Sequence, residues 1–503
     1  MSAITARHPA PPSQQDPTPS PFEAKPTAAK IGAQGILLFA GFGTGQLLSF
    51  ARNAILGHTL SPRDFGIAAS ITLLLQLLEM LSDVGHDRLI VQATDGDRDD
   101  FVATTHTILL ARGMTLALLL YVISPYAAAF FAVPEAQGAF ALIAFVPLIK
   151  GLIHMDCRRA QRRLDNRPQL LVEVAPQALA LAATLPVLKL YPGFEAVVVL
   201  SLIQASSSVV VARLLARTPY RLAFCEDVVK RLLRFGWPIM LSALPLIAVY
   251  QGDRAIVGHL AGIEALAAYS AAFMITMVPG LVAARAGHAL MLPVFASVLR
   301  QKDHLQRSFA TMAEATTILA SVYLGVFIIA GGSLLTLAFG PSYHGLNAVV
   351  AWLAGMWAMR MLQAVPGMAL MAAGDTRPFL VAGLIRASVL PFVFYRAAHG
   401  ASLSEIAAIG CAGEALSLLY VTLRLERLES GLSLTLFSRS TFLVPTAIAA
   451  LLAAQSVGSN PVWTLICAAA MGMALMAAGS AVMPSIRALV RRAIAAQSLI
   501  AEI

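Results

Sequence analysis

Two arginines lie inside apolar stretches that are long enough to cross a membrane. Arg285 falls within the apolar run 265–293, and Arg386 falls within the run 378–397. A charge in the hydrocarbon region is costly, so such a side chain faces a partner or a polar cavity. Arginine suits a phosphate group, because its planar guanidinium donates two charge-assisted hydrogen bonds. The pattern indicates an anionic substrate inside the membrane, with Arg285 as the first candidate ligand because it has no acidic neighbour on its own helix.

Arg386 and Glu414 allow two interpretations. Arg386 lies about eight residues into its run, which at about 1.5 Å per residue places it about 12 Å deep, and Glu414 is similarly deep in the next run. In the first interpretation the two form a mutual ion pair that stabilises this half of the protein. In the second, Arg386 binds an anion and Glu414 carries a proton. Arg360 either lines the same cavity or extends its charged end to the membrane surface.

Other candidate residues lie nearer to the ends of their runs. His288 is three residues from Arg285 and shares its helix face, so it either packs as a polar residue or joins the substrate site. Arg52 and Arg254 are expected near the outer surface as further anion-binding residues. Asp253 is adjacent to Arg254, and we expect it to respond to protons or to gate the outer side.

Glu79 and Asp83 lie four residues apart near the inner end of the second apolar run. Like charges at this spacing repel each other unless a cation or water is close. One interpretation is contact with Arg88, Arg112 or the basic loops. The other is coupling of transport to protons or sodium.

The composition requires membrane helices to position these residues. Hydrophobic residues make up 58% of the 503 residues, whereas charged residues make up only 13%, about half the usual share. A spanning helix needs about 20 apolar residues, so about 14 helices would use about 280 residues. Soluble enzymes and nucleic-acid binders are therefore excluded. We expect an all-α polytopic membrane protein of about 14 transmembrane helices, with two six-helix lobes and two extra C-terminal helices.

The expected spans divide the chain into five parts. These are a disordered Pro-rich cytoplasmic tail at 1–30, an N-lobe at 31–217, a C-lobe at 218–428, a pair of extra helices at 429–485, and a cytoplasmic tail at 486–503. The spans are expected at about 31–52, 65–85, 104–124, 137–155, 170–190, 194–213, 233–252, 265–293, 309–331, 345–366, 378–397, 402–422, 437–455 and 462–483. Because the loops at 156–169 and 213–234 are rich in arginine, the positive-inside rule places both termini in the cytoplasm.

A short internal repeat supports the two lobes. The pentapeptide AILGH at 54–58 recurs as AIVGH at 255–259. Each copy follows an odd-numbered span and precedes an even-numbered one, which predicts a parallel repeat about an axis along the membrane normal. Arg52 and Asp253 flank the two copies, so they are candidates to face each other across this axis. Transporters with two such lobes bind their substrate between them, near the bilayer midplane.

Several motifs resemble a known family in their order and spacing. They are LSPRDFG at 60–66, DVGHDRLIVQ at 83–92, CRRAQRRLDNRPQLLVEV at 157–174, RFGWP at 234–238 and QGDRAIVG at 251–258. These stretches resemble the polysaccharide transporters, the oligosaccharide flippases of the multidrug/oligosaccharidyl-lipid/polysaccharide superfamily. The resemblance extends over roughly residues 31–425.

This resemblance implies a flippase that works by alternating access. Its substrate would be an undecaprenyl-pyrophosphate-linked oligosaccharide, moved across the bacterial inner membrane during synthesis of a cell-surface polysaccharide. The lipid bilayer is then the second partner, a polysaccharide polymerase is a further candidate partner, and no nucleic acid is expected. No cofactor is expected either.

Two other functions stay open at this point. A multidrug or small-solute antiporter of the same superfamily would need an acidic cavity, whereas this chain is richer in intramembrane arginine. A lipid-linked sugar polymerase or ligase is a more distant alternative. Such enzymes resemble one another in having a large external loop with catalytic groups, and the expected spans leave no room for such a loop. We expect no catalytic residue: the chain has no G-x-S-x-G, Walker or H-E-x-x-H motif, and its four cysteines lack metal-ligand spacing.

Overall fold

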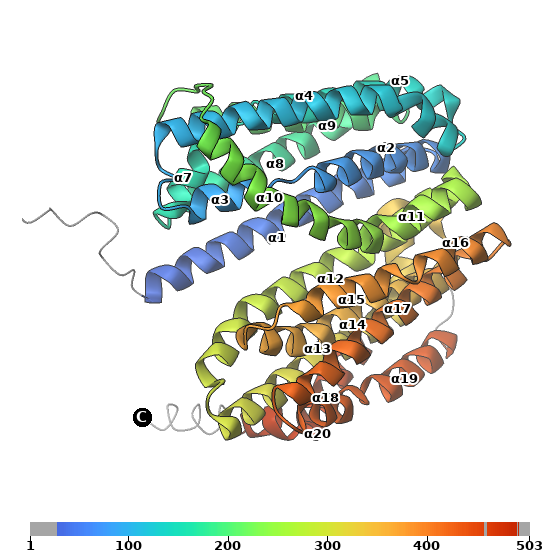
Figure 1. Cartoon of the computed structure of the whole chain (residues 1–503). Helices are drawn as coiled ribbons and strands as arrows, with labels where there is room; N and C mark the ends of the chain where they lie inside the picture. The colour runs from blue at the N-terminus through green and yellow to red at the C-terminus, as the bar shows by residue number, and fades with distance from the viewer. Residues whose placement is uncertain (1–27, 457–459, 490, 492–503) are drawn as a thin grey trace, which may run out of the picture.

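The computed structural model describes residues 28–456, 460–489 and 491, and these are almost entirely helical. The predicted tails at 1–30 and 486–503 lie mostly outside these residues. Two groups of helices lie side by side along most of their length (Figure 1). The first lobe contains α1 (Ala28–Thr59), α2 (Pro62–Leu81), α3 (His86–Gln92), α4 (Asp99–Phe130), η1 (Pro134–Ala136), α5 (Gln137–Leu142), α6 (Phe145–Lys150), α7 (Asp156–Arg162), α8 (Arg167–Leu190) and α9 (Glu195–Leu214).

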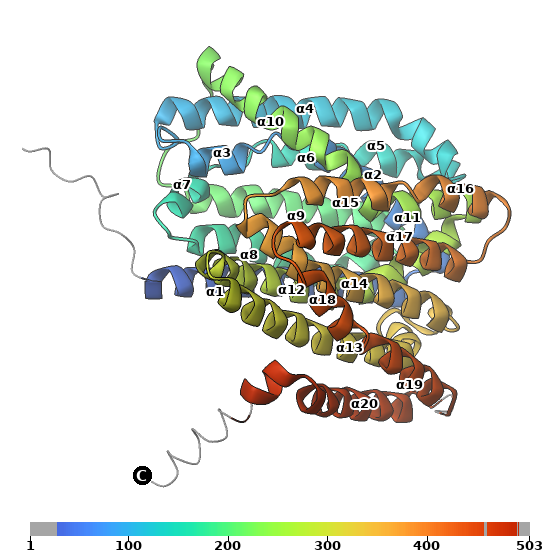
Figure 2. The same ribbon diagram turned by 60° about the horizontal axis from the view of Figure 1, so that its bottom comes forward.

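The second lobe is also built of helices joined by short turns. It contains α10 (Glu226–Ile247), the π-helical turn η2 (Ala248–Gly252), α11 (Asp253–Ile256), a second π-helical turn η3 (Val257–Ala261), α12 (Ile263–Val298), α13 (Lys302–Phe339), η4 (Pro341–Tyr343), α14 (Asn347–Ala372), α15 (Arg377–Ala387), α16 (Leu390–Ala398), α17 (Leu403–Arg424) and η5 (Leu425–Arg427). In the described residues, η5 is followed by α18 (Leu432–Ser440), α19 (Leu443–Ser456) and α20 (Pro461–Val482). Figure 2 shows α19 and α20 beside α13, against which both pack.

Within the described ranges, twelve helices are long and apolar enough to cross a membrane, so the chain is a multi-pass membrane protein. The predicted all-α fold is confirmed, but the predicted count of about 14 is not. Two expected spans are missing from the twelve. The first is covered by α1, which is 32 residues long. The span expected at 137–155 is broken at Ile143 and Ala144 into the short helices α5 and α6.

Local sequence accounts for the bends that shape the site. Ser61 caps α2 by accepting a hydrogen bond from the Asp64 backbone N–H, with Pro62 at the first helical position. Gly85 adopts a φ of +64°, which allows the chain to turn from α2 into α3. Pro238 and Pro245 lie inside α10 and cannot donate helix hydrogen bonds, and two π-helical turns follow. The helix that joins the lobes is therefore irregular along much of its length.

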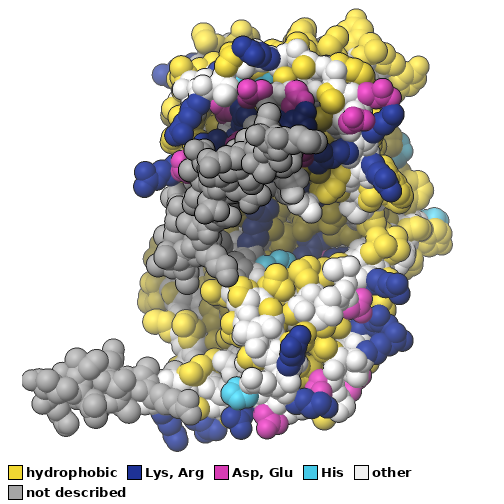
Figure 3. Space-filling view, turned by 60° about the vertical axis from the view of Figure 1, so that its left-hand side comes forward, with side chains coloured by type: hydrophobic (Ala, Val, Ile, Leu, Met, Phe, Trp, Pro, Cys, Tyr) yellow, Lys and Arg dark blue, Asp and Glu magenta, His cyan; other side chains and the backbone are white. Residues whose placement is uncertain are grey.

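The lobes pack tightly at one end, called here the closed end. Phe339 of α13 packs edge-on against Phe50 and Phe65 of the first lobe, with ring centroids 5.8 and 5.9 Å apart. Phe65 also contacts Tyr343, at 6.0 Å. Such aromatic pairs stabilise beyond their buried area. The opposite end is hollowed between the lobes, and lysine or arginine side chains lie along the hollow (Figure 3). We call this hollow the cleft.

The two copies of the repeat make reciprocal contacts at the closed end. A side chain at Gly57 would clash with the ring of Phe339 in the second lobe, and one at Gly258 would clash with the ring of Phe131 in the first. Each glycine therefore admits an aromatic ring from the other lobe. The reciprocity is what a parallel repeat with an axis between the lobes requires.

We expect Gly57→Val and Gly258→Val to loosen the closed end to a similar degree. An overpacked site costs about 1–3 kcal/mol, which the lobes can relieve by separating. The measurement is labelling of Phe50→Cys by a membrane-impermeant maleimide added from the closed side, in a chain without its four native cysteines. Gly45→Val is the matched control, since a side chain there meets open space. Labelling equal to that of the control would contradict the closure.

Candidate functional site between and within the lobes

The second lobe buries a three-residue charge network around Glu414 on α17. One carboxylate oxygen of Glu414 accepts from Nε of Arg360 at 2.5 Å, and the other accepts from Nε of Arg386 at 2.7 Å. Arg386 also donates to the side chain of Gln363. Glu414 is 2% exposed and Arg360 is 8% exposed, so this pair lies in a medium of low dielectric, whereas Arg386 is partly exposed. The ion pair of the first interpretation, between Arg386 and Glu414, is present, and Arg360 shares the same carboxylate.

Two aromatic rings enclose Arg360. Its guanidinium carbon lies 4.6 Å from the ring centre of Trp357 and 4.8 Å from that of Tyr250. Trp357 is one turn away on α14, whereas Tyr250 comes from the π-helical turn η2. Cation–π contacts of this kind strengthen when they are desolvated. Arg360 therefore does not extend to the membrane surface.

Asp253 and Arg254 are buried beside this network. Tyr269 donates its hydroxyl to Asp253 at 2.8 Å, and Arg254 donates to Ser270 at 3.2 Å and to Gln251 at 3.1 Å. Gln251 in turn donates to Gln76 of α2, at 2.9 Å, which joins the two lobes by a side-chain hydrogen bond. Asp253 and Arg254 are thus packed inside the lobe rather than exposed at a surface.

Arg285 has a different environment. It lies on α12 and is exposed, with its guanidinium carbon 3.4 Å from the ring centre of Phe42 on α1 of the other lobe. Among the residues that the structure describes, no carboxylate is within ion-pair distance of it, and Glu173 of α8 acts on it only through a longer-range electrostatic interaction. His288, one turn further along α12, is also exposed. The guanidinium is therefore available to a ligand between the lobes.

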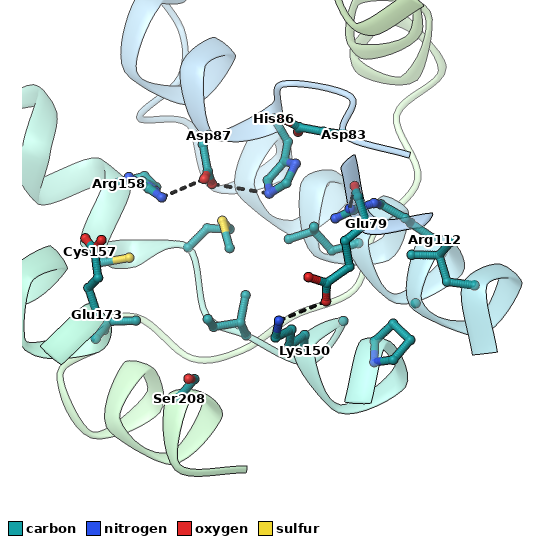
Figure 4. Close-up of a pocket in the computed structure, with 18 of the residues that line it drawn as sticks. Glu79, Asp83, His86, Asp87, Arg112, Lys150, Cys157, Arg158, Glu173 and Ser208 are labelled. Carbon is teal, nitrogen blue, oxygen red and sulfur yellow. Dashed lines mark hydrogen bonds and ion pairs between the residues drawn. The ribbon is translucent and has the colours of Figure 1, made fainter. Parts of the chain in front are cut away.

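A polar pocket of about 470 Å³ lies inside the first lobe (Figure 4). Glu79 points toward Lys150 and pairs with it at 2.8 Å. Asp87 lies between Arg158, at 2.6 Å, and His86, at 3.2 Å. The rest of the wall includes Asp83, Arg112, Glu173 and Ser208. The wall carries both carboxylates and cations among apolar side chains, so the pocket can hold water or small polar groups.

The predicted contacts of Glu79 and Asp83 are partly borne out. Arg112 donates to the backbone oxygen of Glu79 at 2.9 Å, but the carboxylate itself pairs with Lys150. Asp83 accepts from the backbone N–H of Gly85 at 2.9 Å, and so holds the turn into α3. Lys150 lies at the pocket wall, at the end of the short helix α6 that follows the break after α5.

Arg52 lies apart from the other candidates. Its guanidinium donates to Gln204 of α9 at 2.5 Å, within the first lobe. It does not pair with Asp253, whose carboxylate accepts from Tyr269. The two residues hold equivalent positions in the repeat, but the predicted contact between them is absent: each bonds to a residue of its own lobe.

The structure thus separates the ten candidates into three places and leaves Arg52 outside them. Arg360, Arg386, Glu414, Asp253 and Arg254 lie in the second lobe; Glu79 and Asp83 lie at the pocket of the first lobe; Arg285 and His288 lie at the cleft. Sequence reasoning missed the residues that connect these places: Lys150, Glu173, Gln76, Gln251, Tyr250, Trp357 and Gln363. Glutamines within the apolar runs could have indicated some of these residues, because a buried amide needs hydrogen-bond partners.

The segment between the lobes is tied to the first lobe by Asp156 of α7. Its carboxylate accepts from the backbone N–H groups of Arg217 and Thr218, at 2.7 and 3.0 Å, and from the Thr218 hydroxyl at 3.0 Å. Burial raises the pKa of this carboxyl, but the hydrogen bonds from Arg217 and Thr218 outweigh burial and hold the pKa below its ordinary value of 3.8. Stability from this group is therefore present above about pH 4 and is lost as pH falls through the lowered pKa.

We expect Asp156→Ala to free this segment. Two backbone donors would lose a charged acceptor, at a cost of about 1–3 kcal/mol. Hydrogen exchange at neutral pH should then show faster exchange of the Arg217 and Thr218 amides, while exchange in α8 is unchanged. Asp165→Ala is the control, because that carboxylate accepts from the Arg167 N–H two residues away, at 3.3 Å, and not from the Arg217 or Thr218 N–H groups. Unchanged protection in Asp156→Ala would exclude the tether.

Comparison with known proteins gives a consistent picture. The polysaccharide biosynthesis protein family matches residues 55–348. The teichuronic acid biosynthesis protein TuaB of Bacillus subtilis (strain 168) is 22% identical over 330 residues, 65% of this chain and 68% of that protein.

Solved transporter structures share the fold. The lipid II flippase MurJ in an inward closed conformation superposes with a TM-score of 0.70, over 90% of this chain and 99% of that one, at 11% identity. An inward-facing multidrug resistance transporter of the MATE family superposes with a TM-score of 0.55, over 82% of this chain and 98% of that one, at 14% identity. At such identities the likeness extends to the fold and not to the substrate.

Proposed function

The chain belongs to the polysaccharide biosynthesis protein family, and from this premise we propose that it is a flippase for an undecaprenyl-pyrophosphate-linked oligosaccharide in the bacterial inner membrane. The proposal makes it a transporter rather than an enzyme. Its substrate carries a pyrophosphate between a prenyl chain, which stays in lipid, and sugars, which must cross the membrane. The protein must therefore offer an anion site within a polar path.

The exposed guanidinium of Arg285 is the observation that supports this proposal most directly. It lies at the cleft on α12, stacked on Phe42 of the other lobe, without an ion-pair partner among the described side chains. An arginine that is left unpaired at membrane depth is costly unless a ligand or water satisfies it. A pyrophosphate accepts two parallel hydrogen bonds from a guanidinium, so it matches this residue in charge and in shape.

The difference between the packed closed end and the open cleft supports a mechanism of alternating access. The closed end is held by Phe50, Phe65 and Phe339, while the cleft is open at the other end. The arginine-rich loops flank the open end, so by the positive-inside rule that end and both termini face the cytoplasm. In this orientation the head group enters from the cytoplasm, binds Arg285 with His288 nearby, and leaves after the closed end separates.

The first-lobe pocket is the better candidate for coupling to ions. Glu414 already binds two arginines and Asp253 binds Tyr269, so neither carboxylate is free to exchange a proton without breaking a buried contact. Glu79, Asp83 and Glu173 instead line a pocket that can hold water. We therefore assign proton or sodium coupling to this pocket rather than to the second-lobe network.

A deletion strain tests the function. Loss of surface polysaccharide together with accumulation of the lipid-linked oligosaccharide on the inner leaflet supports flipping. Restoration of export by the wild-type gene is the control for effects on neighbouring genes. Unchanged polysaccharide with no accumulated intermediate, combined with new sensitivity to cationic drugs, would instead identify an antiporter. Accumulation of flipped but unpolymerised units would point to a defect at the candidate partner, a polymerase.

A further inference from the structure

The C-terminal end of α4 has a carbonyl that the following chain does not satisfy. A helix carbonyl normally accepts from the N–H four residues later, but the residue four positions after Phe130 is Pro134, which has no N–H. Val133 donates to Ala128 instead, at 2.8 Å. Among the described residues, no backbone N–H outside the helix donates to the Phe130 carbonyl. This carbonyl therefore needs a donor from elsewhere.

His259 of the second lobe supplies that donor. Its Nδ1 lies 2.7 Å from the Phe130 carbonyl oxygen, which can only accept, so Nδ1 carries a hydrogen. The imidazole also stacks on the Phe130 ring, with centroids 4.2 Å apart and an interplanar angle of 9°. His259 belongs to η3, next to Gly258, which admits the ring of Phe131. The contact therefore joins the two lobes at the closed end.

The histidine of the other repeat copy has a related position. His58 lies against Gly340, which directly follows α13, since a Cβ at Gly340 would be 3.4 Å from the His58 Nδ1. Each copy thus places its histidine at the C-terminal end of a long helix of the other lobe. Of the two, it is His259 for which the structure describes a hydrogen bond to the helix carbonyl.

A proton on this imidazole would strengthen the contact. The C-terminal end of a helix carries partial negative charge, so a cation there is more favourable than a neutral group. An aromatic face also attracts a cation. Because Nδ1 is already the donor to Phe130, a proton added at Nε2 breaks no hydrogen bond that the structure describes. His259 is exposed, and imidazole is the side chain that changes charge between about pH 5 and 8.

The ionisable groups around His259 do not compete for this interaction. η3 packs against α11, α12 and α16. Among the described residues, no carboxylate lies within ion-pair distance of His259. Tyrosines on these helices are neutral below about pH 9. The acidic and basic side chains that these helices and the segment after α4 bring to the closed end are Glu135, paired with Arg63; Asp253 and Arg254, buried; Glu264; and Arg396, paired with Glu405.

We propose that His259 is a proton-sensitive latch, which holds the lobes together at the closed end more firmly when its imidazole is charged. A proton shifts an equilibrium between two arrangements only if it interacts differently with each, and the contact with α4 exists only in the closed one. A fall in pH at this end therefore favours closure, and a rise in pH favours separation. The latch needs no substrate, so it stands or fails independently of the proposed function.

Spin labels on the two lobes test the proposal in the solubilised full chain. Tyr126→Cys on α4 and Leu337→Cys on α13 carry the labels, because these positions are 72% and 68% exposed, and the four native cysteines are replaced. Distances between the labels give the ratio of separated to closed molecules. This ratio should fall about two- to fivefold between about pH 8 and pH 5.5, as expected for a charge at a helix C-terminus. A ratio that is the same at both pH values would overturn the proposal.

Variants of the histidine locate the effect. His259→Gln can still donate to Phe130 but does not titrate, so the pH response should disappear. His259→Arg keeps a charge at every pH, so the ratio should stay near its acid value. His399→Gln is the matched control: the His399 Nδ1 lies 2.7 Å from the Tyr395 carbonyl oxygen and the two rings are 4.3 Å apart, but both residues belong to the second lobe. A pH response that persists in His259→Gln, or is lost in His399→Gln alone, would refute the latch.

Discussion

Arg285→Ala should reduce export of surface polysaccharide by roughly 10- to 150-fold, with the protein at normal abundance in the membrane. Charge-assisted hydrogen bonds contribute about 1.5–3 kcal/mol each, and 1.4 kcal/mol corresponds to a factor of ten. Abundance should not fall, because Arg285 is exposed and the removal of its side chain strands no ion-pair partner among the described residues. The measurement is complementation of the deletion strain, with quantification of polysaccharide and of accumulated lipid-linked oligosaccharide.

Two further variants sharpen this result. Arg285→Lys keeps the charge but loses the planar pair of donors, so export should be intermediate. Arg396→Ala is the matched control, since Arg396 forms an exposed ion pair with Glu405 at 2.6 Å and should affect export little. Wild-type export by Arg285→Ala at normal abundance would remove Arg285 from the substrate site.

The second large effect concerns stability. Glu414→Gln should destabilise the protein by about 3–5 kcal/mol, because it removes the charge that the buried guanidinium of Arg360 shares with the partly buried one of Arg386. Arg360 and Arg386 would then lie in the second lobe without a carboxylate at 2.5 and 2.7 Å. Unfolding of the solubilised protein in denaturant measures the loss.

The control for this change is Glu405→Gln on the same helix. Glu405 is 48% exposed and pairs with Arg396, so its replacement should cost less than about 1 kcal/mol. A loss for Glu414→Gln no larger than that of the control would mean that the network is wet or already uncharged.

Much of this arrangement could be read from local sequence. Runs of about 20 apolar residues predict helices whatever surrounds them, because every backbone group in lipid must be satisfied within its own segment. Charges inside those runs mark polar sites for the same reason, and so Arg285, Arg360, Arg386 and Glu414 were found. The repeat at 54–58 and 255–259 predicted equivalent positions in two lobes. The structure places both copies at the closed end.

The pairing of these residues could not be read in the same way. Which side chains meet depends on the rotation and spacing of helices that are distant in sequence, and packing sets both. Glu414 binds Arg360 as well as Arg386 because α14 and α15 both face α17. Lys150 reaches Glu79 across 71 positions because the predicted span at 137–155 breaks in two. Arg285 has no ion-pair partner among the described residues because α12 presents it to the cleft. Hydrophobicity therefore determines which residues enter the membrane, while the packing of whole helices determines which charges are satisfied there and which remain available to bind a ligand.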